Sequence, residues 1–138
     1  MPKPLSDAVV FAIDDEEQNL ALLKRVLATV CRLETFSNAD LALAAAKASQ
    51  PDLFLIDYRM PGRSGTELLA EFRAAGIKSP VVFLTAYPEE SGLQALAGSN
   101  DVLWIAGKPF DPAHLSSQVS MALALGRMRA RNKTAVPA

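Results

Sequence analysis

The sequence predicts an open α/β fold in which five parallel strands alternate with five helices in a single domain. Three observations support this prediction. Short apolar runs without polar alternation are typical of strands covered on both faces. The segments between them carry apolar residues at helical spacing, and parallel neighbours need right-handed helical crossovers. With 138 residues, of which 50% are apolar and 21% charged, the chain can build one sizeable core.

The central strand is expected at Leu53–Asp57, where four apolar residues run into a carboxylate and the turn residues Pro61 and Gly62 follow. Its lack of polar alternation indicates burial on both faces. Ligands gather at the carboxyl ends of the strands in parallel sheets, so Asp57 is a candidate site residue. An aspartate that only caps the following turn would show the same local pattern, so the neighbouring strands must decide.

The N-terminal part predicts two strands and a helix. The apolar run Ala8–Ile13 is the first strand, and it leads directly into the acidic residues 14–17. Leucines at helical spacing predict an amphipathic helix over Glu17–Val30, and the acids in its first turn suit the helix dipole. Arg32–Phe36 alternates with period two, which indicates a strand nearer the edge of the sheet.

Two helices flank the central strand. An alanine-rich segment predicts a helix over 39–48, with Ser37 or Asn38 as its capping residue. A third helix is expected after the central strand, and Gly76 ends it.

The C-terminal part predicts two strands and two helices. The apolar runs 80–84 and 102–106 are expected as the fourth and fifth strands. A helix is expected between them over 88–97, although its glycine and few apolar residues weaken it. An aspartate N-cap and a proline at the first helical position open a last helix over 112–128. The basic tail 129–138 lacks apolar periodicity and is expected to fray.

Charge and cysteine content exclude several classes of protein. The 14 lysines and arginines almost balance the 15 acids, so no overall field favours nucleic acid or an anionic membrane. The single Cys31 is expected as a buried free thiol, and it argues against a disulfide scaffold or a cysteine-based metal site. No apolar run approaches the ~18 residues of a membrane span, and residues 1–5 lack the apolar core of a signal peptide. A cytoplasmic location is therefore expected.

Parallel strands would collect five polar residues at one edge of the sheet, namely Asp14, Asp15, Asp57, Thr85 and Lys108. Two carboxylates repel by about 4 kcal/mol at 4 Å with an effective dielectric constant near 20. One lysine offsets only part of this repulsion. A divalent cation with oxygen ligands, Mg²⁺ rather than zinc or copper, would supply the rest. A metal beside a carboxylate, with a hydroxyl and an ammonium opposite, is also what phosphoryl transfer requires.

Four motifs stand at these strand ends: Asp14-Asp15-Glu16, Asp57-Tyr-Arg-Met-Pro-Gly-Arg-Ser-Gly65, Leu84-Thr85-Ala86 and Lys108-Pro109-Phe110. With them the chain resembles, over Val9–Leu125, the receiver domain of bacterial two-component response regulators. The resemblance implies a flavodoxin-like (βα)5 three-layer sandwich with a five-stranded parallel sheet in the order 2-1-3-4-5. It also implies a receiver domain over residues 1–128, with 129–138 as a flexible basic tail or the start of a linker.

The resemblance implies a set of ligands for Mg²⁺ as the cofactor. Asp15 would bind the ion directly and Asp14 mainly through water. Asp57 and the backbone carbonyl of Arg59 would complete the protein ligands. The side chains of Arg59 and Tyr87 would overhang the site and limit attack by water.

The resemblance also assigns the residues that handle the phosphoryl group. Asp57 would be the phosphoacceptor. Thr85 would bind the phosphoryl group and move with it, and Lys108 would pair with it. The peptide bond between Lys108 and Pro109 would be cis, which is otherwise uncommon in folded proteins.

The family's switch aromatic on the fifth strand is less clearly placed in this chain. Counting back from Lys108 reaches Ile105, whereas counting forward from Thr85 reaches Trp104. A single extra residue between Trp104 and Lys108, absorbed as a bulge at Gly107, would reconcile the two counts. Trp104 is the favoured switch residue, with a tryptophan packed permanently against the last helix as the alternative.

The function that the resemblance implies is a phosphorylation-controlled signalling switch rather than an enzyme. A histidine kinase or phosphotransfer protein would supply the phosphoryl group to Asp57. A phosphatase or phosphotransferase with Asp57 as nucleophile is an alternative, but Arg59 stands where haloacid-dehalogenase-type phosphatases place a second aspartate. A degenerate receiver that acts only as a binding module is a second alternative.

The last helix predicts a partner surface. It carries two apolar stripes: Leu115, Val119 and Ala122, expected to face the sheet, and Met121, Leu125 and Met128. The second stripe is expected to join the fourth helix and fifth strand in a homodimer or partner interface. No membrane contact and no direct nucleic-acid binding are expected, because the basic tail has no aromatic partners. The chain is either a stand-alone receiver or a fragment of a longer regulator.

Overall fold

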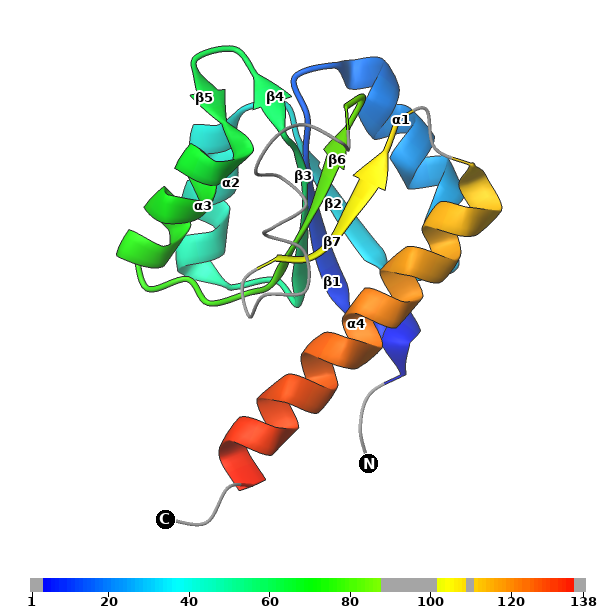
Figure 1. Ribbon diagram of the computed structural model, residues 1–138, viewed down its shortest axis with the longest axis vertical. Coiled ribbons are helices and arrows are strands. Elements are labelled where there is room, and N and C mark those ends of the chain that lie inside the picture. Colours follow the sequence, from blue (N-terminus) through cyan, green and yellow to red (C-terminus); the bar gives the residue numbers. More distant parts are fainter. Residues whose placement is uncertain (1–3, 88–101, 109–110, 136–138) are drawn as a thin grey trace.

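The structure is a computed structural model that describes residues 4–87, 102–108 and 111–135 (Figure 1). Its parallel sheet has five strands in the order β2-β1-β3-β6-β7, which confirms the predicted order because β6 and β7 are the fourth and fifth strands of that sheet. The strands are β1 (Val9–Ile13), β2 (Arg32–Phe36), β3 (Leu53–Asp57), β6 (Val81–Thr85) and β7 (Val102–Gly107), with a short antiparallel pair, β4 (Arg59–Met60) and β5 (Arg63–Ser64). The helices of the described part are a 3-10 turn (Leu5–Asp7), α1 (Glu17–Val26), α2 (Ala39–Ala48), α3 (Gly65–Ala74) and α4 (Pro112–Ala135).

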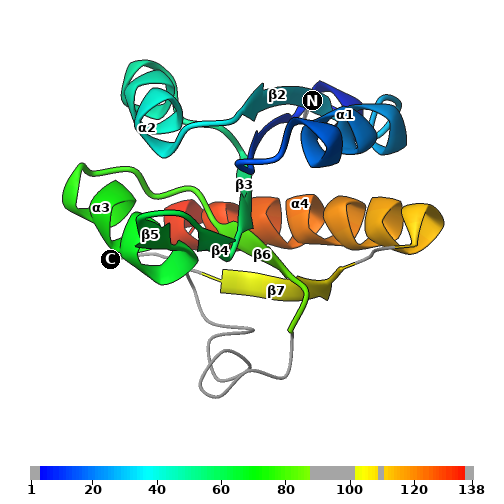
Figure 2. The same ribbon diagram turned by 90° about the horizontal axis from the view of Figure 1, so that it is seen from above.

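The helices cover both faces of the sheet. Figure 1 and Figure 2 show α1 and α4 on one face and α2 and α3 on the other. Each face has its own apolar cluster, and residues of β3 alternate between the two. Every residue of β3 is buried, whereas β2 at the edge is partly exposed, as the sequence predicted. The stripe Leu115, Val119 and Ala122 is fully buried against the sheet, as expected.

Two helix ends differ from the prediction. α1 ends at Val26 rather than at Val30, because the β-branched Thr29 and Val30 are poor helix formers and the chain turns through a Val30 N–H to Leu27 carbonyl bond of 3.0 Å. α4 continues to Ala135 instead of fraying from residue 129. No glycine or proline lies between residues 127 and 135, and arginine, methionine and alanine all favour the helix. The helix predicted over 88–97 lies outside the described residues.

The register between β6 and β7 contains one irregularity. Val81 pairs with Val102, but Val82 pairs with Trp104, so Leu103 is an extra residue on β7. Such a bulge places two successive side chains on one face. Leu103 and Trp104 accordingly both lie with the cluster on the α1 and α4 face, and Ile105 lies on the opposite face.

The predicted bulge at Gly107 is therefore wrong. Gly107 pairs regularly with Thr85, and the register from Trp104 onward is uninterrupted. Counting residues showed that β7 holds one residue too many, but it could not show where the strand accommodates it.

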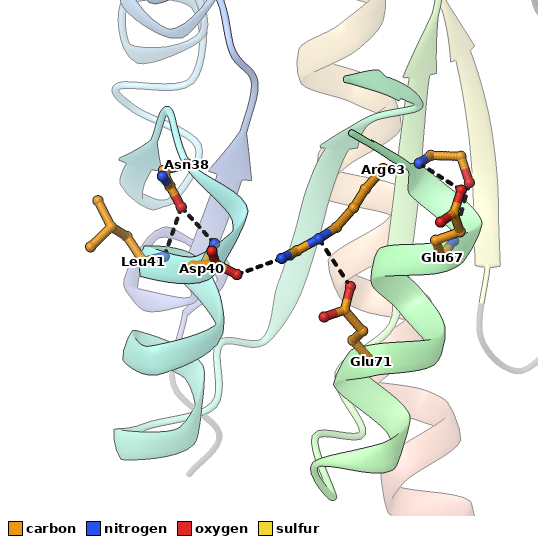
Figure 3. A network of polar contacts seen from close by, with 7 residues as sticks. Asn38, Asp40, Leu41, Arg63, Glu67 and Glu71 are labelled. Atoms are coloured by element: carbon orange, nitrogen blue, oxygen red, sulfur yellow. Dashed lines mark hydrogen bonds and ion pairs between the residues drawn. The ribbon is translucent and has the colours of Figure 1, made fainter. Parts of the chain in front are cut away.

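Side-chain caps fix the helices that approach the acidic edge. Asn38, not Ser37, caps α2, and its Oδ1 accepts from the backbone N–H groups of Asp40 and Leu41 at 2.7 and 3.3 Å (Figure 3). Ser64 caps α3 in a reciprocal capping box with Glu67.

The loop after Asp57 is held close to the sheet. Gly65 opens α3, and a Cβ added there would come within 2.6 Å of the Phe83 ring, so only glycine allows this approach. The Gly65 N–H donates to the Tyr58 carbonyl at 2.7 Å, and Tyr58 N–H donates to the Leu84 carbonyl at 2.9 Å. These contacts place the residues that follow Asp57 directly above the end of β6.

Candidate functional site

The ends of four parallel strands deliver the predicted site residues to one edge of the sheet. Asp14 follows β1, Asp57 ends β3, Thr85 ends β6 and Lys108 follows β7. The strands are in register there, because Ile13 pairs with Ile56, Asp57 with Leu84 and Thr85 with Gly107. Asp15 directly follows Asp14, so all five candidates lie at this edge, and the reading of Asp57 as a simple turn cap does not account for the arrangement.

Asp14, Asp15 and Asp57 form a compact group of carboxylates. Each offers an oxygen, and these atoms all lie within 4.8 Å of one another. Asp14 and Asp57 are buried, at 1% and 6% exposure, while Asp15 is exposed. At this spacing each pair repels by about 3 to 4 kcal/mol with an effective dielectric constant near 20. The donor set consists of hard oxygen ligands with one open side, which fits Mg²⁺ and its retained waters.

Lys108 neutralises part of this charge. Its Nζ lies 3.1 Å from Asp57 Oδ1 and 3.2 Å from Asp14 Oδ2. Burial alone would lower the pKa of Lys108, but the two carboxylates outweigh burial and raise it. One ammonium among three carboxylates leaves two negative charges, which matches a divalent cation.

The ionised form of Asp57 is disfavoured by its surroundings. Burial raises its pKa, and the neighbouring Asp14 raises it further, while the hydrogen bond from Lys108 lowers it without cancelling the rise. A cation at the site would remove this penalty.

Asp14 is held by its own hydrogen bonds. Its Oδ1 accepts from the Glu16 backbone N–H at 2.9 Å, and its Oδ2 accepts from Asn19 Nδ2 at 3.1 Å. The sequence analysis missed Asn19. The available signal was its place in the first turn of α1, five residues after Asp14, where the helix begins beside the acidic edge.

Thr85 is buried and oriented from both sides. Its hydroxyl oxygen accepts from the Tyr87 backbone N–H at 3.0 Å, which leaves the hydroxyl hydrogen free to donate. Its carbonyl accepts from the Lys108 backbone N–H at 2.7 Å, so the end of β6 is hydrogen-bonded to the residue that follows β7.

An open pocket of about 460 Å³ gives access to the site. It is lined by Glu16, Asn19, Leu22, Asp57, Arg59, Thr85, Ala86 and Lys108. The guanidinium carbon of Arg59 lies 5.7 Å from the centroid of the Tyr87 ring, a cation–π contact between two exposed side chains. The sequence placed both residues near the pocket but could not show that they contact each other. The Lys108–Pro109 bond lies outside the described residues.

The site lies at the carboxyl ends of the strands of an open α/β sheet, where such domains bind their ligands, and it combines carboxylates, a hydroxyl and an ammonium, the groups that phosphoryl transfer requires. The chain belongs to the response regulator receiver domain family, whose model matches residues 10–120. This finding confirms the resemblance drawn from the four motifs.

Several relatives are transcriptional regulators. The chain is 34% identical over 127 residues to the regulatory protein AtoC of Escherichia coli, covering 87% of this chain and 26% of AtoC. It is 34% identical over 106 residues to the DNA-binding transcriptional regulator NtrC of Salmonella typhimurium, covering 75% of this chain and 22% of NtrC. It is 30% identical over 119 residues to the regulatory protein PhoP of Bacillus subtilis, covering 83% of this chain and 48% of PhoP. The chain thus spans about a quarter to a half of these relatives.

Solved receiver domains share the fold. The signal receiver domain of a putative Luxo repressor protein from Vibrio parahaemolyticus superposes with a TM-score of 0.79 at 18% identity, over 90% of this chain and 95% of that one. A CheY-like receiver domain from Methanospirillum hungatei superposes with a TM-score of 0.74 at 21% identity, over 86% of this chain and 96% of that one.

None of the helices in the described part of the chain has the length and apolar character needed to span a membrane.

Proposed function

We propose that Asp57 is the phosphoacceptor of this phosphorylation-controlled switch. The observation that supports the assignment is its position. Asp57 is the buried last residue of β3, it lies 3.1 Å from the Lys108 ammonium, and its side chain lines the same open pocket as Thr85. Of the three carboxylates, Asp57 is the one that both contacts the Lys108 ammonium and lines the open pocket.

In the proposed reaction, a carboxylate oxygen of Asp57 attacks the phosphorus of the donor. The bond from phosphorus to the donor's imidazole nitrogen breaks, and its electron pair stays with the imidazole, which takes up a proton from water. Thr85 donates its free hydroxyl hydrogen to a phosphoryl oxygen, and Lys108 pairs with another. Mg²⁺ held by Asp14, Asp15, Asp57 and the Arg59 carbonyl would neutralise the charge that accumulates on the phosphoryl oxygens.

We propose Ile105, rather than Trp104, as the residue at the switch position. The bulge lies at Leu103, before Trp104, so the regular register counts back from Lys108 to Ile105. Trp104 packs against the cluster beneath α4, which is the alternative that the sequence left open. If this assignment is right, phosphorylation changes the fluorescence of Trp104 little. A large change in emission, lost in the Trp104→Phe variant, would restore Trp104 as the switch.

The phosphoryl donor is expected to be a histidine kinase or phosphotransfer protein, as for other receivers. We propose that α4 contributes an interface to a second copy or to a partner. Met121 and Met128 are each 56% exposed and lie one above the other on α4, whereas Leu125, expected in the same stripe, packs partly against the core. Direct nucleic-acid binding by this domain is not part of the proposal.

Incubation with acetyl phosphate and Mg²⁺, followed by intact-mass measurement, tests the function. We expect the mass of one phosphoryl group to be added, and Asp57→Asn and chelation with EDTA each to abolish the gain. A gain that persists in Asp57→Asn would overturn the assignment of the acceptor. No gain in the wild-type protein would overturn the proposed function.

A further inference from the structure

Arg63 connects three elements that surround the acidic site. It lies on β5, and its Nη2 is 2.6 Å from Asp40 Oδ1 in the first turn of α2 (Figure 3). Its Nε is 3.2 Å from Glu71 Oε2 on α3. The Arg63 side chain is 28% exposed, less than its partners at 71% and 41%, so the guanidinium is the inner member of the network.

The segment that carries Arg63 is the one that follows Asp57. β4 begins at Arg59, and its short pairing with β5 joins Arg59 to Ser64 and Met60 to Arg63. Each strand of this hairpin has two residues, and an isolated hairpin of that size is not stable in water. The hairpin therefore depends on contacts with the rest of the domain for its position.

Besides the backbone bonds of Tyr58 and Gly65, two side chains supply such contacts. Ser64 fixes one end of the hairpin through the capping box of α3. Arg63 links the hairpin to two helices, because its two ion pairs join it to Asp40 on α2 and to Glu71 on α3. The Arg63–Asp40 bond is a polar tie between the hairpin and α2, beside the apolar packing of Met60.

The same arginine lines a cavity together with Asp15, a proposed metal ligand. A cavity of about 420 Å³ next to the acidic site is lined by Asp15, Asp40, Met60, Gly62 and Arg63, among others. Asp15 is the exposed member of the carboxylate group, so its setting depends on the walls of this cavity. The bond between Arg63 and Asp40 fixes the distance between two of those walls.

We infer that Arg63 is a positioning residue for the metal site: it holds the β4–β5 hairpin so that the Arg59 carbonyl and the surroundings of Asp15 are set for a divalent cation. This inference rests on the proposed Mg²⁺ site.

The network contributes little to stability by itself. Its carboxylates are largely exposed, and such pairs stabilise a protein by only about 0–1 kcal/mol. Arg63 Nη1 is buried and has no hydrogen-bond partner among the described residues, which further reduces the gain. A positioning residue of this kind is expected to affect metal affinity more than the free energy of unfolding.

The test measures Mg²⁺ affinity by calorimetry and the melting temperature in EDTA for four proteins: the wild type, Arg63→Met, Arg63→Lys and Arg25→Met. Arg25 is an exposed arginine on α1 and serves as the matched control. We expect Arg63→Met to weaken Mg²⁺ binding about 3- to 10-fold. This is less than the ~10–100-fold typical of groups that bond directly to a ligand, because Arg63 acts through the backbone. Arg63→Lys is expected to recover part of the affinity, since one ammonium cannot bind both carboxylates in the same geometry.

Equal Mg²⁺ affinity in the wild type and Arg63→Met would overturn the inference while leaving the proposed function intact. Should Arg63→Met fold poorly, Asp40→Asn removes only the link to α2 and is expected to weaken Mg²⁺ binding in the same direction; unchanged affinity there would also overturn the inference. A wild-type protein that binds no Mg²⁺ would instead overturn the proposed function itself.

Discussion

Replacing Lys108 by methionine separates the role of its charge from that of the metal. The ammonium lies 3.1 Å from Asp57 Oδ1 and 3.2 Å from Asp14 Oδ2. Each contact is worth about 5 kcal/mol of Coulomb energy at an effective dielectric constant near 20, before desolvation is subtracted. Removing one partner of a buried ion pair costs about 3–5 kcal/mol, because it leaves the other charge buried and unpaired.

We expect Lys108→Met to lose about 3 kcal/mol of unfolding free energy in EDTA. The loss stays near the lower figure, because burial already raises the pKa of Asp57, and removing the lysine, which lowers that pKa, favours the neutral acid further. In saturating Mg²⁺ the cation compensates the same carboxylates, so the loss is expected to fall to about 1 kcal/mol. The variant should therefore gain more stability from Mg²⁺ than the wild type does.

Urea unfolding at pH 7, with EDTA and with Mg²⁺, measures both quantities. Unchanged m-values would show that the midpoint shifts report stability. Lys47→Met is a suitable control, since Lys47 is an exposed lysine in the last turn of α2. An equal loss with and without Mg²⁺ would refute the reasoning, because it would mean that the lysine and the ion do not act on the same charges.

Three further outcomes follow from single side chains. The raised pKa of Asp57 means that its ionised form destabilises the metal-free fold at pH values above the ordinary carboxyl range. Asp57→Asn should therefore raise the melting temperature in EDTA at pH 7 and abolish the rise caused by Mg²⁺. A lower melting temperature of the variant in EDTA would contradict this. Burial raises the pKa of Cys31 to about 11, so its thiol should react with maleimide at pH 8 only after unfolding in urea, and rapid reaction of the native protein would exclude such burial. The ring of Tyr87, which contacts Arg59, should shield the acceptor from water. Tyr87→Ala should therefore shorten the half-life of the phosphoprotein several-fold, whereas Tyr87→Phe keeps the ring and should not. Equal half-lives of the wild type and Tyr87→Ala would count against shielding.

The fold was predictable because its strands are determined locally. β3 and β6 are short apolar runs, buried along their whole length, and their sequence pattern does not depend on the neighbours they pair with. The polar residues directly after such runs were therefore correctly expected at the same edge of the sheet. Helix ends were less predictable, because the end of α1 is decided by the turn at Leu27 rather than by the apolar stripe.

Contacts that join distant parts of the chain could be predicted only as a group. The sequence placed Lys108 and Asp14 at the same edge although 94 residues separate them, because both follow strands of one parallel sheet. It could not predict the bond between Arg63 and Asp40, 23 residues apart, because neither residue directly follows a strand of that sheet. Topology determines which strand ends meet, whereas the pairing of side chains on a hairpin and a helix depends on rotamers and exposed fractions that the sequence pattern does not contain.

The register of β7 shows why the position of a bulge within a strand matters for function. The extra residue is at Leu103, near the start of the strand, so the last four residues of β7 remain in regular pairing with β6 and the Lys108 N–H still reaches the Thr85 carbonyl. A bulge at Gly107 would have displaced that bond and with it the ammonium that pairs with Asp57. Accommodating the extra residue away from the site preserves the geometry of the polar edge and moves the tryptophan to the face of α4. The shift of one residue therefore keeps the site residues in register and, under the proposed assignment, places Ile105 rather than Trp104 at the switch position.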